Sequence, residues 1–263
     1  MLLIGEKINV MSKTIGPAMK ERNPEPIVEL AKEQIEAGAN MLDLNVGPAT
    51  KKGDEMMAWL VETVQGAVDV PLCLDTTNPV AMEAGLAAHK GQAMINSTSG
   101  DPERMQTMMP LAAQYNAKLI GLALTEKGIP RDANERMSVA VDIMTGCMEH
   151  GVDLENLYLD PLVLSITVPG AQYQAMEVVE SIKMFRQLND PPLKTVVGLS
   201  NISNGALPET KPLLDSVFLT MLLDAGLDAA IVDPFEAELM NTMKTIRVLG
   251  NETVYCHSYL ELC

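Results

Sequence analysis

The chain alternates short apolar runs with helical segments along its whole length, and this alternation limits the folds open to it more than any other feature. Eight runs have strand length and composition: residues 2–4, 41–46, 72–74, 93–95, 118–124, 157–159, 195–199 and 229–232. Most segments between them carry apolar residues at helical spacing, as Ile27, Ala31 and Ile35 do. The first and eighth runs begin 227 positions apart, or about 32 residues per βα unit, close to the roughly 250 residues that eight units need. We therefore predict one domain over residues 1–263, a (β/α)8 TIM barrel.

Boundary residues support this prediction. Asp54 and Asp101 stand where helix N-caps are expected, Pro102 fits a first helical turn, and Gly151 follows a helical stretch where a left-handed C-cap is expected. A doubly wound open sheet also alternates strands and helices and is the main alternative. The count of eight strands favours the barrel, and neither GxGxxG nor GxxxxGK[ST] is present to indicate a nucleotide fold.

Charge and composition exclude several partners. The 35 acidic residues outnumber the 19 lysines and arginines, so the net charge is -16, the wrong sign for binding nucleic acid or an anionic membrane surface. No apolar run approaches the roughly 18 residues of a transmembrane helix, and the N-terminus has no basic secretory signal. The cysteines Cys73, Cys147, Cys256 and Cys263 are scattered without CxxC spacing, which favours a reducing compartment. We expect a cytoplasmic protein in which Cys73 and Cys147 are buried.

Polar side chains accompany seven of the eight predicted strands near the point where each strand ends. In a barrel of this kind the active site forms at that end, so these residues share one rim. They are Glu6, Asn9, Asp43, Asn45, Asp75, Asn96, Asp160, Asn201 and Asp233. Each Asp or Asn taken alone is explained equally well by a turn or a helix cap. As a set they favour a neutral, nitrogen-rich ring, because a carboxylate accepts two adjacent N–H groups of an aminopyrimidinone and a carboxamide both donates and accepts.

Residue types missing from the predicted rim narrow the chemistry. No lysine stands at a predicted strand end, which argues against a Schiff-base aldolase. His89 and His150 fall near predicted helix C-termini, and Cys256-His257 alone is a weak metal signal, so we predict no bound metal. The absence of GxSxG leaves a serine-hydrolase triad without a signature.

With these motifs in view, the sequence resembles the pterin-binding barrel family, and within it the methyltetrahydrofolate:corrinoid/iron–sulfur protein methyltransferases. The resemblance covers nearly the entire chain. The residues that carry it include Gly-Glu-Lys-Ile-Asn at 5–9, Leu-Asp-Leu-Asn-Val-Gly-Pro at 42–48, Leu-Cys-Leu-Asp at 72–75, Met-Ile-Asn-Ser-Thr at 94–98, Tyr-Leu-Asp-Pro-Leu at 158–162 and Gly-Leu-Ser-Asn-Ile-Ser at 198–203. Dihydropteroate synthase and the folate module of cobalamin-dependent methionine synthase are related. The synthase needs a loop rich in Gly, Ser and Arg after its second strand, and residues 47–52 do not provide one.

The resemblance implies roles for individual residues. Asp75, Asn96 and Asp160 would hold the pterin ring, and Asn201 would approach N5, the atom that carries the methyl group. Asn204 stands where the family usually has Gln. Lys211 stands in place of a family Arg after a loop two residues longer, so it would offer the glutamate tail of folate a single ionic contact at most.

The reaction implied is an SN2 methyl transfer between N5 of tetrahydrofolate and the cobalt of a corrinoid, in a direction that the sequence does not fix. Breaking the N5–methyl bond requires a hydrogen bond or proton at N5. The rim has no obvious acid that is neutral at pH 7, so we expect Asn201 to donate to N5, with a water chain reaching Asp75 as a further element. No Asp-x-His-x-x-Gly corrinoid motif is present, and we expect a separate corrinoid protein to dock over the rim. The family also suggests a homodimer.

Two other functions stay open at this point. A folate-binding protein without catalysis would bind pterins tightly and show no cobalt-dependent turnover. A different pterin enzyme, such as dihydropteroate synthase, would prefer a dihydropterin substrate to methyltetrahydrofolate.

Overall fold

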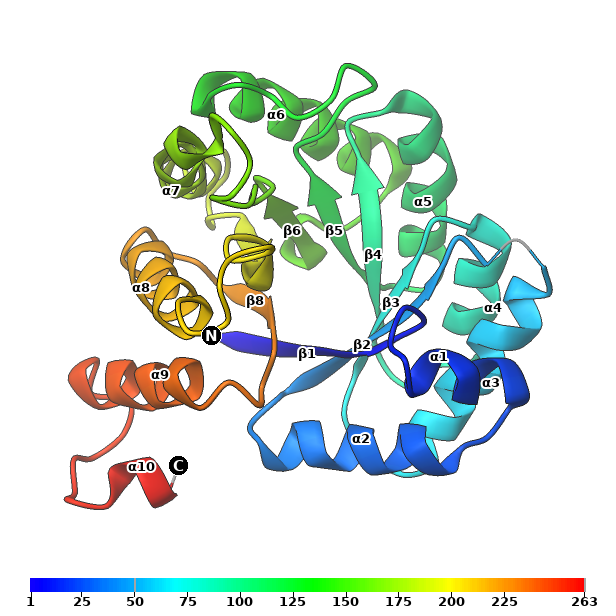
Figure 1. Ribbon diagram of the computed structural model, residues 1–263. Helices are drawn as coiled ribbons and strands as arrows, with labels where there is room; N and C mark the ends of the chain where they lie inside the picture. Colours follow the sequence, from blue (N-terminus) through cyan, green and yellow to red (C-terminus); the bar gives the residue numbers. More distant parts are fainter. Residues whose placement is uncertain (50, 263) are drawn as a thin grey trace.

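Eight parallel strands close into a barrel in the order β1-β2-β3-β4-β5-β6-β7-β8 in the computed structural model, which describes residues 1–49 and 51–262 (Figure 1). The strands are β1 Leu2–Asn9, β2 Met41–Gly47, β3 Leu72–Thr76, β4 Met94–Ser99, β5 Lys118–Leu122, β6 Leu157–Asp160, β7 Lys194–Gly198 and β8 Ala229–Val232. The predicted TIM barrel is therefore confirmed, and each of the eight predicted runs overlaps one strand.

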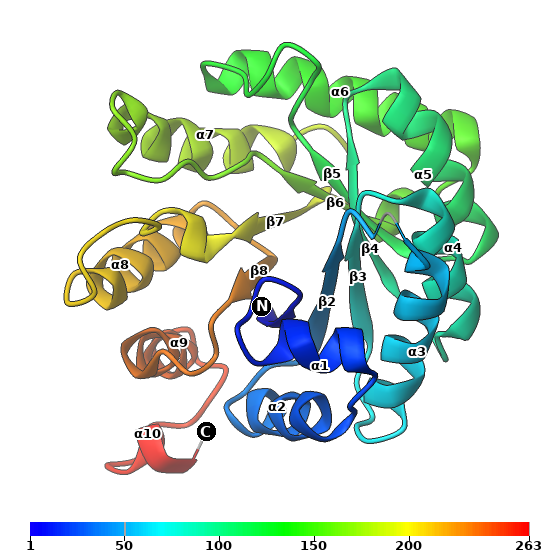
Figure 2. The same ribbon diagram turned by 45° about the vertical axis from the view of Figure 1, so that its right-hand side comes forward.

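Helices surround the strands on the outside of the barrel (Figure 2). They are α1 Ile15–Glu21, α2 Glu25–Glu36, α3 Gly53–Gln65, α4 Pro79–Ala88, α5 Pro102–Gln114, α6 Ala133–His150, α7 Gln174–Phe185, α8 Lys211–Asp224, α9 Ala237–Leu249 and α10 Tyr259–Leu262, with short 3-10 turns η1 Leu154–Asn156, η2 Ala171–Tyr173 and η3 Leu199–Asn201. The apolar faces follow the sequence pattern: Met57, Leu60, Val61 and Val64 of α3 are all fully buried.

Alternation along the strands divides the barrel interior into an apolar floor and a polar mouth. Every second residue of a strand faces the barrel axis. The floor is formed by Ile4, Met41, Cys73, Met94, Ile120, Tyr158, Val196 and Ala229. Two positions further along their strands stand Glu6, Asp43, Asp75, Asn96, Leu122, Asp160, Gly198 and Ile231. Because all strands run in the same direction, these residues, most of them polar, form the next layer toward the open end.

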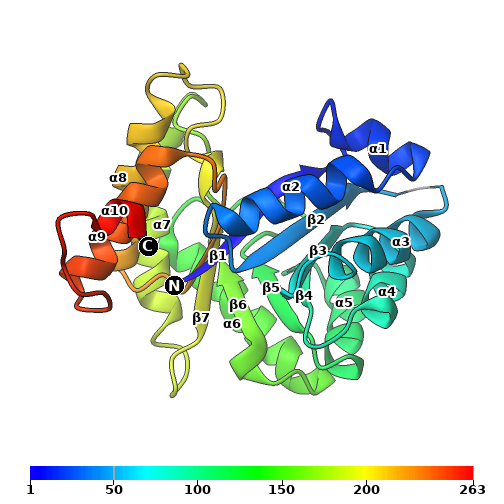
Figure 3. The ribbon, with the colours of Figure 1, turned by 90° about the horizontal axis from the view of Figure 1, so that it is seen from below.

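The loops that follow the strands rise around this mouth. Figure 3 shows α1, which follows β1, and the loop between β7 and α8 projecting from the same side of the barrel, the side on which the strands end. Gly198, the last residue of β7, leads directly into the turn η3, which carries Ser200 and Asn201. The mouth is therefore bordered by the segments that carry the predicted site residues.

Most helix-boundary predictions are confirmed. The Asp101 side chain accepts a hydrogen bond from the Glu103 backbone N–H and caps α5, and Gly151 ends α6 with a left-handed φ of 75°. The cap predicted at Asp54 is wrong, because α3 begins at Gly53 and its N-cap is Lys52. Asp54 instead lies in the first turn, where its carboxylate interacts favourably with the helix dipole.

The structure describes three of the four cysteines. Cys73 and Cys147 are buried, as predicted, and Cys256 is exposed, whereas Cys263 lies outside the described residues. In the part of the chain that the structure describes, no helix is long and apolar enough to span a bilayer.

The apolar floor predicts a large difference between two methionines. Met94 is fully buried in the floor, whereas Met176 on α7 is 56% exposed. Met94→Ala should lower the free energy of unfolding by about 2–5 kcal/mol, since it leaves a cavity, and Met176→Ala should change it by about 0.5 kcal/mol or less. Urea unfolding of both variants measures this, and equal losses would contradict the packing described.

Candidate active site

Four predicted rim residues lie side by side because of the strand register. Asn9 of β1 pairs with Asn45 of β2, Asn45 pairs with Asp75 of β3, and Asp75 pairs with Asn96 of β4. Neighbouring strands lie about 4.8 Å apart, so the row presents three carboxamides and the carboxyl group of Asp75 along one side of the mouth. Asp43 stands one inward position below Asn45 and is 4% exposed.

Hydrogen bonds orient the side chains of this row. The Asn45 amide donates to Asp75 Oδ2, and the Asn96 amide donates to Asp43 Oδ1 at 3.1 Å. The Asn45 carbonyl oxygen accepts from the Gly47 backbone N–H at 2.9 Å, so both ends of that carboxamide are fixed. Among the described residues, the Asn96 carbonyl oxygen accepts no hydrogen bond, which leaves it available to a ligand N–H group.

Burial changes the proton affinity of the two carboxyl groups. Burial raises the pKa of Asp75 to about 6, against the opposing effects of the Asn45 hydrogen bond and the Arg104 charge. The pKa of Asp43 is raised well above its usual range, mainly by burial and to a smaller extent by the neighbouring Asp75 charge. Two close carboxyl groups resist simultaneous ionisation. Of the two, Asp43 is therefore the harder to ionise.

Asp160 ends β6 on the same inward face. Its side chain is 6% exposed, and its Oδ1 accepts from the Leu162 backbone N–H at 2.7 Å. Burial raises the pKa of Asp160 to about 7, even though the Leu162 hydrogen bond and the Arg136 charge act in the opposite direction. Burial therefore gives Asp160 a neutral fraction near pH 7, which the sequence pattern does not indicate.

Two arginines that the sequence analysis missed stand behind the mouth. Arg104 of α5 donates to the backbone carbonyls of Thr76, Thr77 and Ser97, which joins the ends of β3 and β4. Arg136 of α6 is fully buried and donates to the Pro161 carbonyl at 2.8 Å, beside Asp160. Both stand on helices, so the pattern of polar residues after each strand does not indicate them.

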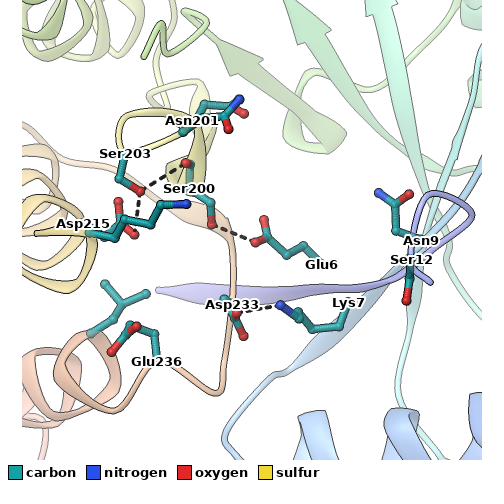
Figure 4. A pocket seen from close by; sticks show the side chains of 13 residues that line it. Glu6, Lys7, Asn9, Ser12, Ser200, Asn201, Ser203, Asp215, Asp233 and Glu236 are labelled. Carbon is teal, nitrogen blue, oxygen red and sulfur yellow. Dashed lines mark hydrogen bonds and ion pairs between the residues drawn. The ribbon is translucent and has the colours of Figure 1, made fainter. Parts of the chain in front are cut away.

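A cavity of about 610 Å³ lies between β1, the loop from β7 to α8, α8 and the start of α9 (Figure 4). Its lining includes six of the predicted residues, namely Glu6, Asn9, Asn201, Asn204, Lys211 and Asp233. Ser200, Ser203, Asp215 and Glu236, which were not predicted, also line it. Asp43, Asn45, Asp75, Asn96 and Asp160 are not part of this lining, so the predicted residues form two groups at the same mouth.

Polar contacts hold the cavity walls together. The Ser200 hydroxyl donates to Glu6 Oε1 at 2.8 Å, and Lys7 Nζ contacts Asp233 Oδ2 at 2.6 Å (Figure 4). The Ser203 hydroxyl donates to Asp215 Oδ2 at 3.1 Å. The first two contacts join β1 to the end of β7 and to the segment after β8, across the seam where the barrel closes.

Lys7 corrects the expectation that no lysine stands at a strand end. β1 extends to Asn9, and its register with β2 shifts between Gly5 and Ile8. A β-bulge of this kind breaks simple alternation, so the consecutive residues Glu6 and Lys7 both line the cavity. The Lys7 ammonium forms an ion pair with the Asp233 carboxylate.

Several rim residues also form turns, as the simpler explanation for Asp and Asn requires. Asn9 Oδ1 accepts from the Met11 backbone N–H at 2.8 Å, and Asp233 Oδ1 accepts from the Phe235 N–H at 3.0 Å. Asn45 and Asp160 make the same contact two residues along. In each case one side-chain oxygen accepts the hydrogen bond that shapes the loop, and the side chain keeps a second polar atom for another partner. A role in a turn is therefore compatible with a role in ligand binding.

Within residues 1–49 and 51–262, no group of three or more His, Cys, Asp and Glu side chains has an arrangement that could hold a metal ion. His89 accepts a hydrogen bond from the Leu72 backbone N–H at the C-cap of α4, and His257 contacts Tyr255 in the C-terminal segment.

The molecule is a closed (β/α)8 barrel with a layer of carboxyl and carboxamide side chains at its mouth. Residues 5–233 match the family described as pterin binding enzyme. The chain belongs to this family.

Similar proteins of known name narrow the comparison. The chain is 29% identical to the methylcorrinoid:tetrahydrofolate methyltransferase of Eubacterium limosum, and the match covers 98% of this chain and 94% of that protein. It is 32% identical to the methionine synthase of Mycobacterium tuberculosis over 91% of this chain but 21% of that much longer protein. Among solved structures, dihydropteroate synthase from Stenotrophomonas maltophilia aligns with a TM-score of 0.73 at 19% identity, over 97% of this chain and 94% of that one, which is a likeness of fold.

The buried Asp160 predicts a pH-dependent effect on stability. Its pKa is higher in the folded than in the unfolded state, so folding favours the protonated form. That stabilisation is complete below about pH 4 and is lost as the pH rises through about 7. Asp160→Asn should therefore stabilise the protein more at pH 8 than at pH 5, by about 2–3 kcal/mol.

Urea unfolding at the two pH values measures this difference, with Asp142→Asn on the exposed face of α6 as the control for loss of one charge. A stability gain that is the same at both pH values would contradict a raised pKa at Asp160.

Proposed function

We propose that the protein transfers a methyl group between N5 of tetrahydrofolate and the cobalt of a corrinoid carried by a separate protein. The observation that carries the proposal is the array of inward carboxyl and carboxamide groups at the ends of β2, β3, β4 and β6. The near end-to-end similarity to a protein named methylcorrinoid:tetrahydrofolate methyltransferase supports the choice of reaction within the family.

Pterin binding is assigned to Asp75, Asn96 and Asp160. A pterin presents a ring N–H and an exocyclic amine on one edge, which a carboxylate accepts as a pair. The pKa of Asp75 is raised to about 6 and that of Asp160 to about 7, so Asp75 is the more readily ionised of the two. The Asn96 amide donates to Asp43, and its carbonyl oxygen would accept from a ligand N–H group. The fixed Asn45 amide limits the movement of Asp75, so the site is ordered before the ring arrives.

The transfer step is assigned to the neighbourhood of Asn201. In one direction, N5 of tetrahydrofolate displaces Co(I) from the methyl group and its proton leaves. In the other, Co(I) displaces N5 from the methyl group and a proton is added. By microscopic reversibility the same residues serve both directions. Asn201 lines the cavity beside the mouth, where its carboxamide would hydrogen bond to N5 in the transition state.

The remaining assignments concern the partner and the tail of folate. The corrinoid protein would dock over the open end of the barrel, where the loops rise around the cavity. Lys211 would make the single ionic contact to the glutamate tail, and Asn204 would line its path. A homodimer and a cytoplasmic location stay predictions from the sequence.

The Asn201 role predicts a selective loss of turnover. Asn201→Ala should lower kcat/KM for methyl transfer by about 10²–10³-fold, while the Kd for methyltetrahydrofolate changes by about threefold or less, because the carboxamide acts mainly in the transition state. An anaerobic assay with cobalamin, which follows the cobalt absorbance, measures the first quantity, and calorimetry measures the second.

The same two measurements separate the alternatives. Tight folate binding by the wild type without turnover on free or protein-bound corrinoid would indicate a binding protein. Preference for a dihydropterin substrate would indicate another pterin enzyme. Equal losses of binding and turnover in the variant would contradict the role of Asn201.

Gly198 provides an independent probe of where the Asn201 side chain lies. Its φ of −78° suits any residue, but an added Cβ would lie 2.9 Å from Asn201 Nδ2. Gly198→Ala should therefore displace the carboxamide and lower kcat about tenfold, with a small effect on unfolding. In a double-mutant cycle the same change should have little effect in the Asn201→Ala background. Additive losses would contradict this contact.

A further inference from the structure

The proposed reaction needs a proton acceptor that the carboxamide of Asn201 cannot supply. Methylation of N5 releases one proton, and demethylation consumes one. An amide side chain holds and orients a hydrogen bond, but it has no pKa near neutrality with which to accept a proton. A titratable group within reach of N5 must therefore take part, and this requirement rests on the function proposed above.

Most carboxyl groups around the mouth have another partner. Asp43 and Asp75 receive the amides of Asn96 and Asn45. Asp160 shapes the turn at Leu162. Asp233 pairs with Lys7, and Asp215 accepts from Ser203. These contacts, together with the assignment of the pterin ring to Asp75 and Asp160, leave two cavity carboxyl groups that accept from a hydroxyl, Glu6 and Asp215. Glu6 is favoured because its partner Ser200 directly precedes Asn201 in η3.

The contact of Glu6 leads directly to the neighbour of Asn201. Glu6 extends from β1 into the cavity, and the Ser200 hydroxyl donates to its Oε1 at 2.8 Å (Figure 4). Ser200 and Asn201 are consecutive residues of η3, and all three line the same cavity. A hydroxyl that donates to a carboxylate keeps a lone pair for a second donor. We propose that Glu6 is the proton acceptor and donor for N5, acting through the Ser200 hydroxyl.

The step balances without any further reactant. As the N5–methyl bond forms, the N5–H proton passes to the Ser200 oxygen while the Ser200 hydroxyl proton passes to Glu6. Ser200 is unchanged, Glu6 becomes neutral, and the electron pair of the cobalt–carbon bond stays on the cobalt of the corrinoid substrate. Glu6 then loses its proton to solvent through the open cavity. The reverse reaction follows the same route with protonated Glu6 as the acid.

The surroundings of Glu6 suit this exchange. Burial raises its pKa, the Ser200 hydrogen bond lowers it, Asp233 and Asp215 raise it and Lys7 lowers it. Asp43 on β2 is the carboxyl group that interacts with Glu6 from the other side. A raised pKa brings the carboxyl group closer to the neutral pH at which a proton must be both accepted and released.

The experiment compares four variants in methyl transfer from methyltetrahydrofolate to Co(I) cobalamin at saturating folate between pH 5.5 and 8. Glu6→Gln and Ser200→Ala should each lower kcat about 10²-fold, remove the rise of kcat at low pH, and abolish the solvent isotope effect. The Kd for folate should change by about threefold or less. Glu29→Gln on the exposed face of α2 controls for the loss of one charge, and Asp75→Asn tests the alternative proton route. Thermal unfolding checks that each variant is folded.

Each outcome decides the proposal. Loss of the pH dependence in Glu6→Gln and Ser200→Ala, with Glu29→Gln behaving as wild type, supports it. A wild-type pH profile in Glu6→Gln, or a profile lost only in Asp75→Asn, overturns it while the methyltransferase function stands. Absence of methyl transfer by the wild type overturns the proposed function and this role together.

Discussion

Closure of the parallel barrel is the constraint on which the site depends. Closure directs every second strand residue inward, and a floor that includes Ile4, Met41 and Met94 fills the lower interior. The next inward layer is therefore open on one side, and a sequence with Asp, Asn and Glu in that layer concentrates polar groups at the mouth. The barrel seam between β8 and β1 adds the cavity, because the bulge in β1 directs both Glu6 and Lys7 into it.

The buried carboxyl groups at the mouth are costly to ionise, and this cost favours a ligand that donates hydrogen bonds to them. Burial raises the pKa of Asp75 to about 6 and that of Asp160 to about 7, so part of their charge is unfavourable in the folded protein at neutral pH. Ligand N–H groups would compensate for that lost hydration. Arg104 and Arg136 hold the neighbouring backbone carbonyls and keep the loops in place around the acids. Binding of a donor-rich ring, as proposed, would therefore offset part of this cost.

Much of this organisation was predictable from sequence, and the exceptions have physical causes. All eight strands and the polar residues at their ends follow from short-range patterns. The cavity depends on long-range contacts, such as Lys7 with Asp233 and Ser200 with Glu6, which no local pattern indicates. The bulge in β1 broke the alternation that would have placed Lys7 outside. The raised pKa of Asp160 depends on burial by segments distant in the chain. Arg104 and Arg136 act from α5 and α6, and no pattern at the strand ends indicates them.

The central claim is that the inward array binds the pterin ring and presents N5 to the cavity beside Asn201. A crystal structure of the protein with bound methyltetrahydrofolate tests this most directly. The account predicts the pterin ring within hydrogen-bond distance of Asp75, Asn96 and Asp160, with the N5 methyl group facing the open end of the barrel near Asn201 and Ser200. A pterin bound elsewhere, or one whose N5 faces the apolar floor, would contradict it.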